Sequence, residues 1–176
     1  MIFVMCIDYR EINKVTIRDN FPLPLIDDCL DFMSGKVWFT LLDLKDGFNQ
    51  CSMDEASIPY TSFVTPHGQY EYLKMPFGLK NAPSNFQRFV YNIFRDLIDA
   101  EKIIVYIDDI LIASESFETH INILKEVLER IYETGLELKL KKCKFAYREI
   151  DYLGSAQQMH ILMLLRSIQF LRIINS

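Results

Sequence analysis

The sequence has no excess of positive charge and no closely spaced cysteines. Its 176 residues include 19 Lys and Arg against 24 Asp and Glu, so the formal net charge is −5. The chain therefore lacks the basic footprint that phosphate binding usually leaves on a protein. The four cysteines, at positions 6, 29, 51 and 143, form no Cys-x-x-Cys pair. This spacing favours isolated reduced thiols over a zinc site or disulfides, and it predicts a cytoplasmic or nuclear protein.

Long apolar runs, internal repeats and low-complexity segments are also missing. No run approaches the roughly 20 apolar residues of a membrane span, and no signal peptide opens the chain, so we expect no membrane association. Half of the residues are hydrophobic, including 13 Phe and 9 Tyr. This length and composition predict one domain with a substantial core, or one domain and a small appendage.

The apolar pattern predicts an α+β fold. Amphipathic spacing indicates one helix from near Pro83 to Ile98 and another over 116–134, and the expected inward residues of the second are Ile121, Leu124, Leu128 and Ile131. Ser116 suits its N-cap and Gly135 its end. A shorter helix is expected over about 25–33, and strands over 3–9, 37–43, 60–65, 69–75, 103–114 (a hairpin) and 136–153. This order predicts an antiparallel sheet with helices on one face. His67 and His120 have no partners at ligand spacing, so we expect both on the surface.

The most informative segment is Tyr106-Ile107-Asp108-Asp109. Apolar β-branched residues on both sides predict two buried strands, joined by a tight turn that contains both aspartates. Asp tolerates the positive φ that such a turn demands. An ordinary polar hairpin turn is the usual explanation of two adjacent aspartates. A third carboxylate in an equally apolar setting favours a metal site instead.

That third carboxylate is Asp43, which ends the apolar run 37–42. An acid at the end of a core strand carries a desolvation cost unless something pairs with it. It can meet Asp108 and Asp109 on one sheet, and three carboxylates can hold two Mg²⁺ ions about 4 Å apart for in-line phosphoryl transfer. We expect Asp43 and Asp108 to be the direct ligands. Mg²⁺ suits hard oxygen ligands, and Mn²⁺ can take its place.

Several stretches keep a fixed order and spacing over residues 5 to about 154. They are CIDYREINKVTIRDNFPLPLIDD (6–28), FTLLDLKDGFNQ (39–50), IPYTSFVTPHGQYEYLKMPFGLKNAPSNFQRF (58–89), VYIDDILIAS (105–114), and KCKF with IDYLG (142–154). Together they resemble the reverse transcriptases of gypsy-type long-terminal-repeat retrotransposons. The resemblance implies a polymerase palm with partial, N-terminally truncated fingers over residues 1–154, and a divergent tail over residues 155–176.

The resemblance also implies an activity and its residues. The activity is RNA-directed DNA synthesis, by two-metal nucleotidyl transfer onto a primer 3′-hydroxyl. The implied catalytic and metal-binding groups are Asp43, Asp108, Asp109 and the main-chain carbonyl of Leu44. The implied nucleotide-binding residues are Asp46, Gly47, Phe48, Phe77 and Tyr106. The Phe48 ring would exclude a ribose 2′-hydroxyl; core packing is the alternative for Phe48 and Phe77.

Template and primer contacts are implied for Arg10, Asn13, Gly78 and Gly154, with a surface salt bridge as the alternative for Arg10. The implied partners are an RNA or DNA template with its primer, dNTPs, and the thumb, ribonuclease H and integrase parts of a Pol polyprotein, which this sequence does not contain.

The sequence departs from the family at both ends. Phe3 and Val4 stand where a Trp-Arg pair is common, the upstream lysines that clamp the triphosphate are absent, and the match stops after Gly154. We therefore expect a fragment that makes little or no DNA by itself. One alternative is a catalytically silent remnant that serves as a nucleic-acid or protein binding module. Another is a palm of a different class, such as an RNA-dependent RNA polymerase or a cyclic-dinucleotide synthase. Phe48 and the run 79–83 argue against this second alternative.

Overall fold

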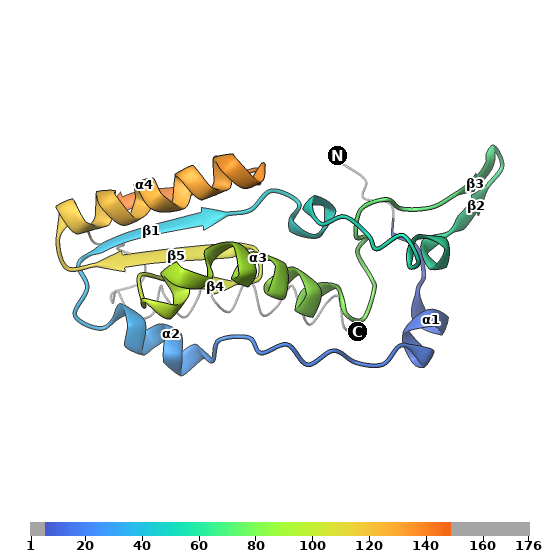
Figure 1. Ribbon diagram of the computed structural model, residues 1–176, viewed down its shortest axis with the longest axis horizontal. Coiled ribbons are helices and arrows are strands. Elements are labelled where there is room, and N and C mark those ends of the chain that lie inside the picture. The colour runs from blue at the N-terminus through green and yellow to red at the C-terminus, as the bar shows by residue number, and fades with distance from the viewer. Residues whose placement is uncertain (1–5, 149–176) are drawn as a thin grey trace.

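A computed structural model describes residues 6–148 of the chain. The strands form a four-stranded sheet and a two-stranded sheet. Figure 1 shows an elongated arrangement: the larger sheet with its helices lies at one end, and the hairpin β2–β3 and helix α1 lie at the other. Gly154, the tail over 155–176 and the end of the strand region expected over 136–153 fall outside the described residues. No helix in the described part of the chain is long and apolar enough to cross a membrane.

The sheet has the strand order β4-β5-β1-β6, and its neighbouring strands are antiparallel. These strands are β1 (Trp38–Asp43), β4 (Ile103–Tyr106), β5 (Asp109–Ser114) and β6 (Lys144–Tyr147). The strand expected over 37–43 and the hairpin expected over 103–114 are both confirmed. The β1–β5 register runs from Trp38 opposite Ser114 to Asp43 opposite Asp109. The last residue of β1 and the first residue of β5 therefore meet at one end of the sheet.

The two long helices, α3 (Ala82–Asp99) and α4 (Phe117–Thr134), pack on one face of this sheet. Phe86, Phe94 and Val127 of these helices join Leu42 and Ile110 of the strands in the main core. Helix α2 (Ile26–Met33) packs on the opposite face, where Met33 meets Phe39 and Ala113. The α+β class and the antiparallel sheet are confirmed, but helices cover both faces, because alternate residues of β1 and β5 are apolar on both sides.

Helix α4 has the ends that the sequence predicts, but its buried face matches the predicted one only in part. The Ser116 hydroxyl accepts a hydrogen bond from the Thr119 N–H at 3.1 Å, and Gly135 closes the helix with φ 70°. The expected inward positions Ile121 and Leu128 are 39% and 36% exposed. The buried residues are His120, Ile123, Val127 and Ile131. The prediction is confirmed for Ile131, and Leu124 is partly buried against the core. It was wrong for Ile121 and Leu128, because two neighbouring stripes of this helix both show i, i+3, i+4 spacing, and only contact with the sheet selects one of them.

The remaining elements are short. They are α1 (Arg10–Val15), the 3₁₀ turns η1 (Gly47–Gln50) and η2 (Ile58–Thr61), β2 (Phe63–Thr65) and β3 (Gly68–Tyr70). The hairpin β2–β3 is shorter than the predicted strands over 60–65 and 69–75. Residues 6–9, the described part of the strand expected over 3–9, form no strand. In the described part of 136–153 there are β6 and an isolated bridge between Leu138 and Leu44.

His120 was expected on the surface but is fully buried. Its ring nitrogens lie 2.7 Å from the Thr40 hydroxyl and 3.0 Å from the Ser114 hydroxyl, so the imidazole links α4 to β1 and β5. These two partners explain how a polar ring is tolerated in the core. Burial lowers the pKa of His120 from its ordinary value of 6.5, because the imidazolium would lose its hydration there.

This burial predicts a pH-dependent stability. In the unfolded chain His120 takes up a proton below pH 6.5, whereas in the folded chain burial opposes this protonation. The contribution of His120 to the free energy of unfolding is therefore fully present above pH 6.5 and is lost as the pH falls below it. Urea unfolding between about pH 8 and pH 5 measures the change. His120→Gln should flatten this part of the profile, whereas His67→Gln, at an exposed position, should leave it unchanged. A profile that His120→Gln does not alter would contradict the assignment.

Candidate active site

Two carboxylates come together because of the β1–β5 register. Asp43 ends β1 directly opposite Asp109, the first residue of β5. Side chains of directly opposed residues point to the same face of a sheet. Both aspartates therefore share the face that carries Phe39 and Leu41, away from α3 and α4. Asp43 is buried in spite of its charge.

The turn that carries Asp108 differs from the predicted one. It consists of Ile107 and Asp108, while Asp109 already belongs to β5. The residue with positive φ is Ile107, at 55°, and not an aspartate. A β-branched side chain in this region is strained, so the surrounding structure must hold the turn in place. One support is the Leu44 N–H, which donates to the Asp108 carbonyl at 2.8 Å.

A second support is the buried side chain of Gln87 in α3. Its Oε1 atom accepts a hydrogen bond from the Ile107 N–H at 2.6 Å, and its Nε2 atom donates to the Val105 carbonyl at 2.9 Å. Both backbone groups belong to the hairpin that carries Asp108. Gln87 is therefore a positioning residue that fixes the strained turn to helix α3.

Asp43 and Asp108 open onto a cavity of about 170 Å³. Its lining includes seven of the site residues that the sequence suggested: Asp43, Leu44, Asp46, Gly47, Phe48, Phe77 and Asp108. Asp109 and Tyr106 are not among its lining residues. Tyr106 is buried and lies directly opposite Asp109 in the β4–β5 pair. The structure thus gathers most of the expected catalytic and nucleotide-binding residues around one space.

The charges at this cavity favour a bound cation. Burial raises the pKa of Asp108, and the nearby negative charge of Asp43 raises it further. A hydrogen bond to Asp43 raises the pKa of Lys142, whose Nζ atom lies 2.7 Å from Asp43 Oδ2. Within residues 6–148 no three His, Cys, Asp or Glu side chains are grouped to hold a metal ion. Asp43 and Asp108 nevertheless supply the hard oxygen donors that Mg²⁺ and Mn²⁺ prefer.

Phe48 serves both the core and the cavity. Its ring is buried and lies 5.3 Å from the Phe77 ring and 5.7 Å from the Phe86 ring, measured between centroids. It also lines the cavity with Phe77, which is half-buried. A Cβ atom at Gly47 would stand 3.0 Å from the Phe86 ring and 3.4 Å from Asp108 Cβ. Gly47 thus allows the η1 turn to approach the aromatic cluster and the Asp108 turn.

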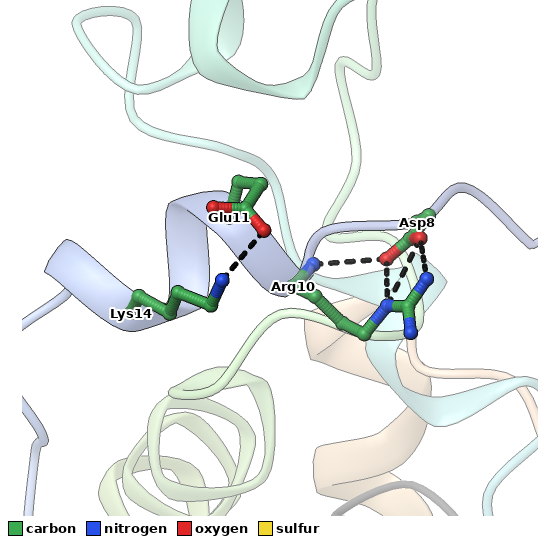
Figure 2. Close-up of polar contacts among 4 residues, drawn as sticks. All are labelled: Asp8, Arg10, Glu11 and Lys14. Atoms are coloured by element: carbon green, nitrogen blue, oxygen red, sulfur yellow. Dashed lines mark hydrogen bonds and ion pairs between the residues drawn. The ribbon is translucent and has the colours of Figure 1, made fainter.

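Arg10, Asn13 and Gly78, three of the expected template contacts, lie outside the cavity. Figure 2 shows Arg10 beside Asp8, where the guanidinium makes hydrogen bonds of 2.6 to 3.0 Å with both carboxylate oxygens. The side-chain hydrogen bond from Arg10 lowers the pKa of Asp8 to about 2. Asn13 donates to the Gly78 carbonyl at 2.8 Å and accepts from the Lys80 N–H at 2.8 Å. The surface salt bridge considered for Arg10 is present, and Asn13 joins α1 to the loop at Gly78. Their template contacts stay predictions.

Three residues of the site were missed from the sequence. Lys139 and Lys142 line the cavity, and Gln87 holds the hairpin. A signal existed for each. The run Lys139-Leu140-Lys141-Lys142 is strongly basic in an acidic chain. Gln87 lies on the apolar stripe of α3 that contains Pro83, Val90 and Phe94, where a polar residue needs a buried partner.

Comparison with known proteins identifies the family. Residues 1–156 match the family model for reverse transcriptase (RNA-dependent DNA polymerase). The chain belongs to the reverse transcriptase family. It is 45% identical over 148 residues to the retrovirus-related Pol polyprotein from transposon 297 of Drosophila melanogaster, an alignment that covers 84% of this chain and 14% of the relative. Polyprotein P3 of Commelina yellow mottle virus is 42% identical over 153 residues, an alignment that covers 86% of this chain and 8% of the polyprotein.

Reverse transcriptases of known structure share the fold. The foamy viral protease-reverse transcriptase in complex with double-stranded DNA matches with a TM-score of 0.73 and 26% identity, over 84% of this chain and 25% of that one. The foamy viral protease-reverse transcriptase in complex with an RNA/DNA hybrid matches with a TM-score of 0.70 and 26% identity, over 84% of this chain and 20% of that one. The chain thus spans a minor part of the length of the reverse transcriptases that it matches.

The Gln87 contacts lead to a prediction on stability. Gln87→Leu keeps the approximate volume but leaves the Ile107 N–H and the Val105 carbonyl without their partner in the core. The free energy of unfolding should fall by about 2–4 kcal/mol, from two unsatisfied backbone groups at about 1–3 kcal/mol each, offset in part by apolar burial. Urea unfolding measures the loss. Asn92→Leu, at an exposed position of the same helix, is the matched control and should change stability little. Equal stabilities for the two variants would show that Gln87 does not hold the turn.

Proposed function

We propose that this chain forms the palm of an RNA-directed DNA polymerase that transfers nucleotides from dNTPs onto a primer 3′-hydroxyl. The observation that carries the proposal is the convergence of Asp43 and Asp108 on a cavity that Phe48 and Phe77 also line. Family membership and the matched fold support it. The family match ends at residue 156, which supports the assignment of residues 1–154 to the polymerase unit and of 155–176 to a separate tail.

In this proposal Asp43 and Asp108 hold divalent metal, with Asp109 and the Leu44 carbonyl as further ligands. Two bound Mg²⁺ ions would lower the pKa of the primer 3′-hydroxyl and stabilise the negative charge on the triphosphate and the leaving pyrophosphate. Asp43 and Asp108 suit this role because neighbouring carboxylates with little hydration repel one another unless a cation lies between them. The raised pKa of Asp108 is consistent with such repulsion.

The other cavity residues would bind and select the nucleotide. The Phe48 ring is held on two sides by Phe77 and Phe86, so it can exclude volume under the sugar without moving. Asp46 and Gly47 belong to the turn next to this ring. Lys139 and Lys142 place positive charge on a wall of the same cavity, where it would stabilise the negatively charged oxygens of a bound triphosphate. Template and primer are proposed to contact Arg10, Asn13, Gly78 and Gly154.

The assignment of Asp108 as a metal ligand predicts that its replacement by the neutral amide Asn reduces primer extension. Residues 6–148 replace the matching segment of an intact retrotransposon reverse transcriptase, and Asp108→Asn is introduced into this chimaera. Primer extension with Mg²⁺ should fall by at least about 100-fold, because the ligand charge is lost where charge develops in the transition state. Thermal unfolding should change little, because the amide keeps the carboxylate's shape. Asp99→Asn, an acid at the end of α3 far from the cavity lining, is the control. Near-normal synthesis by the Asp108 variant would contradict the metal assignment.

The sugar assignment predicts the effect of a smaller side chain at Phe48. In the same chimaera Phe48→Val should raise the ratio of ribonucleotide to deoxyribonucleotide incorporation, because the excluded volume is removed. Phe94→Val is the matched control: it removes a fully buried ring from the same core, but Phe94 lies about two helical turns beyond Phe86 and does not line the cavity. Both variants should lose stability to a similar degree, about 1–3 kcal/mol for a smaller residue in a packed core. Unchanged sugar discrimination in Phe48→Val would leave core packing as the role of Phe48.

A further inference from the structure

Lys142 forms an ion pair with one of the carboxylates of the site. Its Nζ atom lies 2.7 Å from Asp43 Oδ2, and the charges of Asp108 and Asp109 also act on it. The loop that carries it is tied to the end of β1 by the Lys139 N–H, which donates to the Asp43 carbonyl at 2.8 Å. The ammonium thus pairs with one of the three carboxylates that the proposed function assigns to metal, and the negative charges of the other two act on it.

We propose that Lys142 is a built-in counter-ion of the carboxylate site, which neutralises Asp43 until a divalent cation binds there and must leave Asp43 when the cation arrives. The inference rests on the proposed function, because it takes Asp43 and Asp108 as metal ligands. It makes Lys142 a competitor of the metal and not a co-ligand, since an ammonium has donors only.

The exposures of the two partners indicate which one moves. The side chain of Asp43 is 10% exposed, and its position is fixed by the last pair of the β1–β5 ladder. The side chain of Lys142 is 56% exposed and carries its charge on a flexible four-carbon stem. The ammonium can therefore withdraw into water at small cost, while the carboxylate cannot follow it. A divalent cation brings twice the charge to the same oxygens, so the exchange favours the metal.

Lys139 provides the natural comparison. It lines the same cavity, and its positive charge also acts on Asp108. Its bond to Asp43, however, runs from the main-chain N–H, which a side-chain substitution preserves. If the Lys142 ammonium competes with the metal by pairing directly with the Asp43 carboxylate, removal of the Lys142 charge will strengthen metal binding more than removal of the Lys139 charge. If the two lysines instead weaken metal binding only through their positive potential, the two substitutions will raise the metal affinity by the same factor.

The test is a Mn²⁺ titration of the whole chain, followed by the electron paramagnetic resonance signal of free Mn²⁺. Lys142→Gln should bind Mn²⁺ about tenfold more tightly than the original chain, the effect of about 1.4 kcal/mol of lost charge competition. Lys142→Arg, which keeps the charge, should bind like the original chain, and Lys139→Gln should change the affinity much less than Lys142→Gln. Asp108→Asn should weaken binding in every background.

The outcomes separate this inference from the proposed function. Equal or weaker binding by Lys142→Gln, or equal gains from Lys139→Gln, would overturn the counter-ion role, while a loss of binding in Asp108→Asn would leave the metal site standing. Binding that Asp108→Asn does not alter would overturn both.

A second measurement needs no charge-removing substitution. The side-chain ammonium signal of Lys142 in the ¹⁵N-lysine-labelled chain, assigned by its loss in Lys142→Arg, should shift as Mg²⁺ is added and reach its end point as the site saturates. A signal that stays in place at saturating Mg²⁺ would show that Lys142 keeps its contact with Asp43, and would overturn the inference.

Discussion

The pairing register of β1 and β5 is the constraint on which the candidate site depends. It places Asp43 opposite Asp109 at the end of both strands. A slip of one residue would turn Asp43 toward the face packed by α3 and α4, because side chains alternate between the faces of a strand. Leu42, Ile110 and Ile112 resist such a slip, since each is fully buried on that face. Apolar packing on the face of the sheet that contacts α3 and α4 thus fixes the positions of Asp43 and Asp109 on the opposite face.

Asp108 depends on a second, local constraint. Its turn requires positive φ at Ile107, a conformation that a β-branched residue adopts only under restraint. Two hydrogen bonds from Gln87 supply that restraint from inside the core. The buried Gln87 therefore stabilises the strained turn, and the turn places Asp108 at the cavity next to Asp43. The result is two neighbouring carboxylates, of which Asp43 is buried and Asp108 half-buried, and the nearby Lys142 offsets part of their charge.

Much of the fold and the acidic centre of the site could be predicted from the sequence, because they rest on local patterns. The apolar runs before Asp43 and around Asp108 give the strands, and Ser116 and Gly135 give the ends of α4. The features that were missed depend on tertiary contacts. The buried stripe of α4 is selected by the sheet, and His120 is buried because Thr40 and Ser114 bond to its ring. Lys142 follows Asp43 by 99 positions, so only the folded chain shows that they pair.

A crystal of the chain soaked in Mn²⁺ would show whether Asp43 and Asp108 bind metal, because the metal can be located by its anomalous scattering. We expect an anomalous peak within coordination distance of Asp43 and Asp108 oxygens, with the Lys142 ammonium turned away from Asp43. Anomalous peaks confined to surface acids, with the Asp43–Lys142 ion pair intact at saturating Mn²⁺, would contradict it.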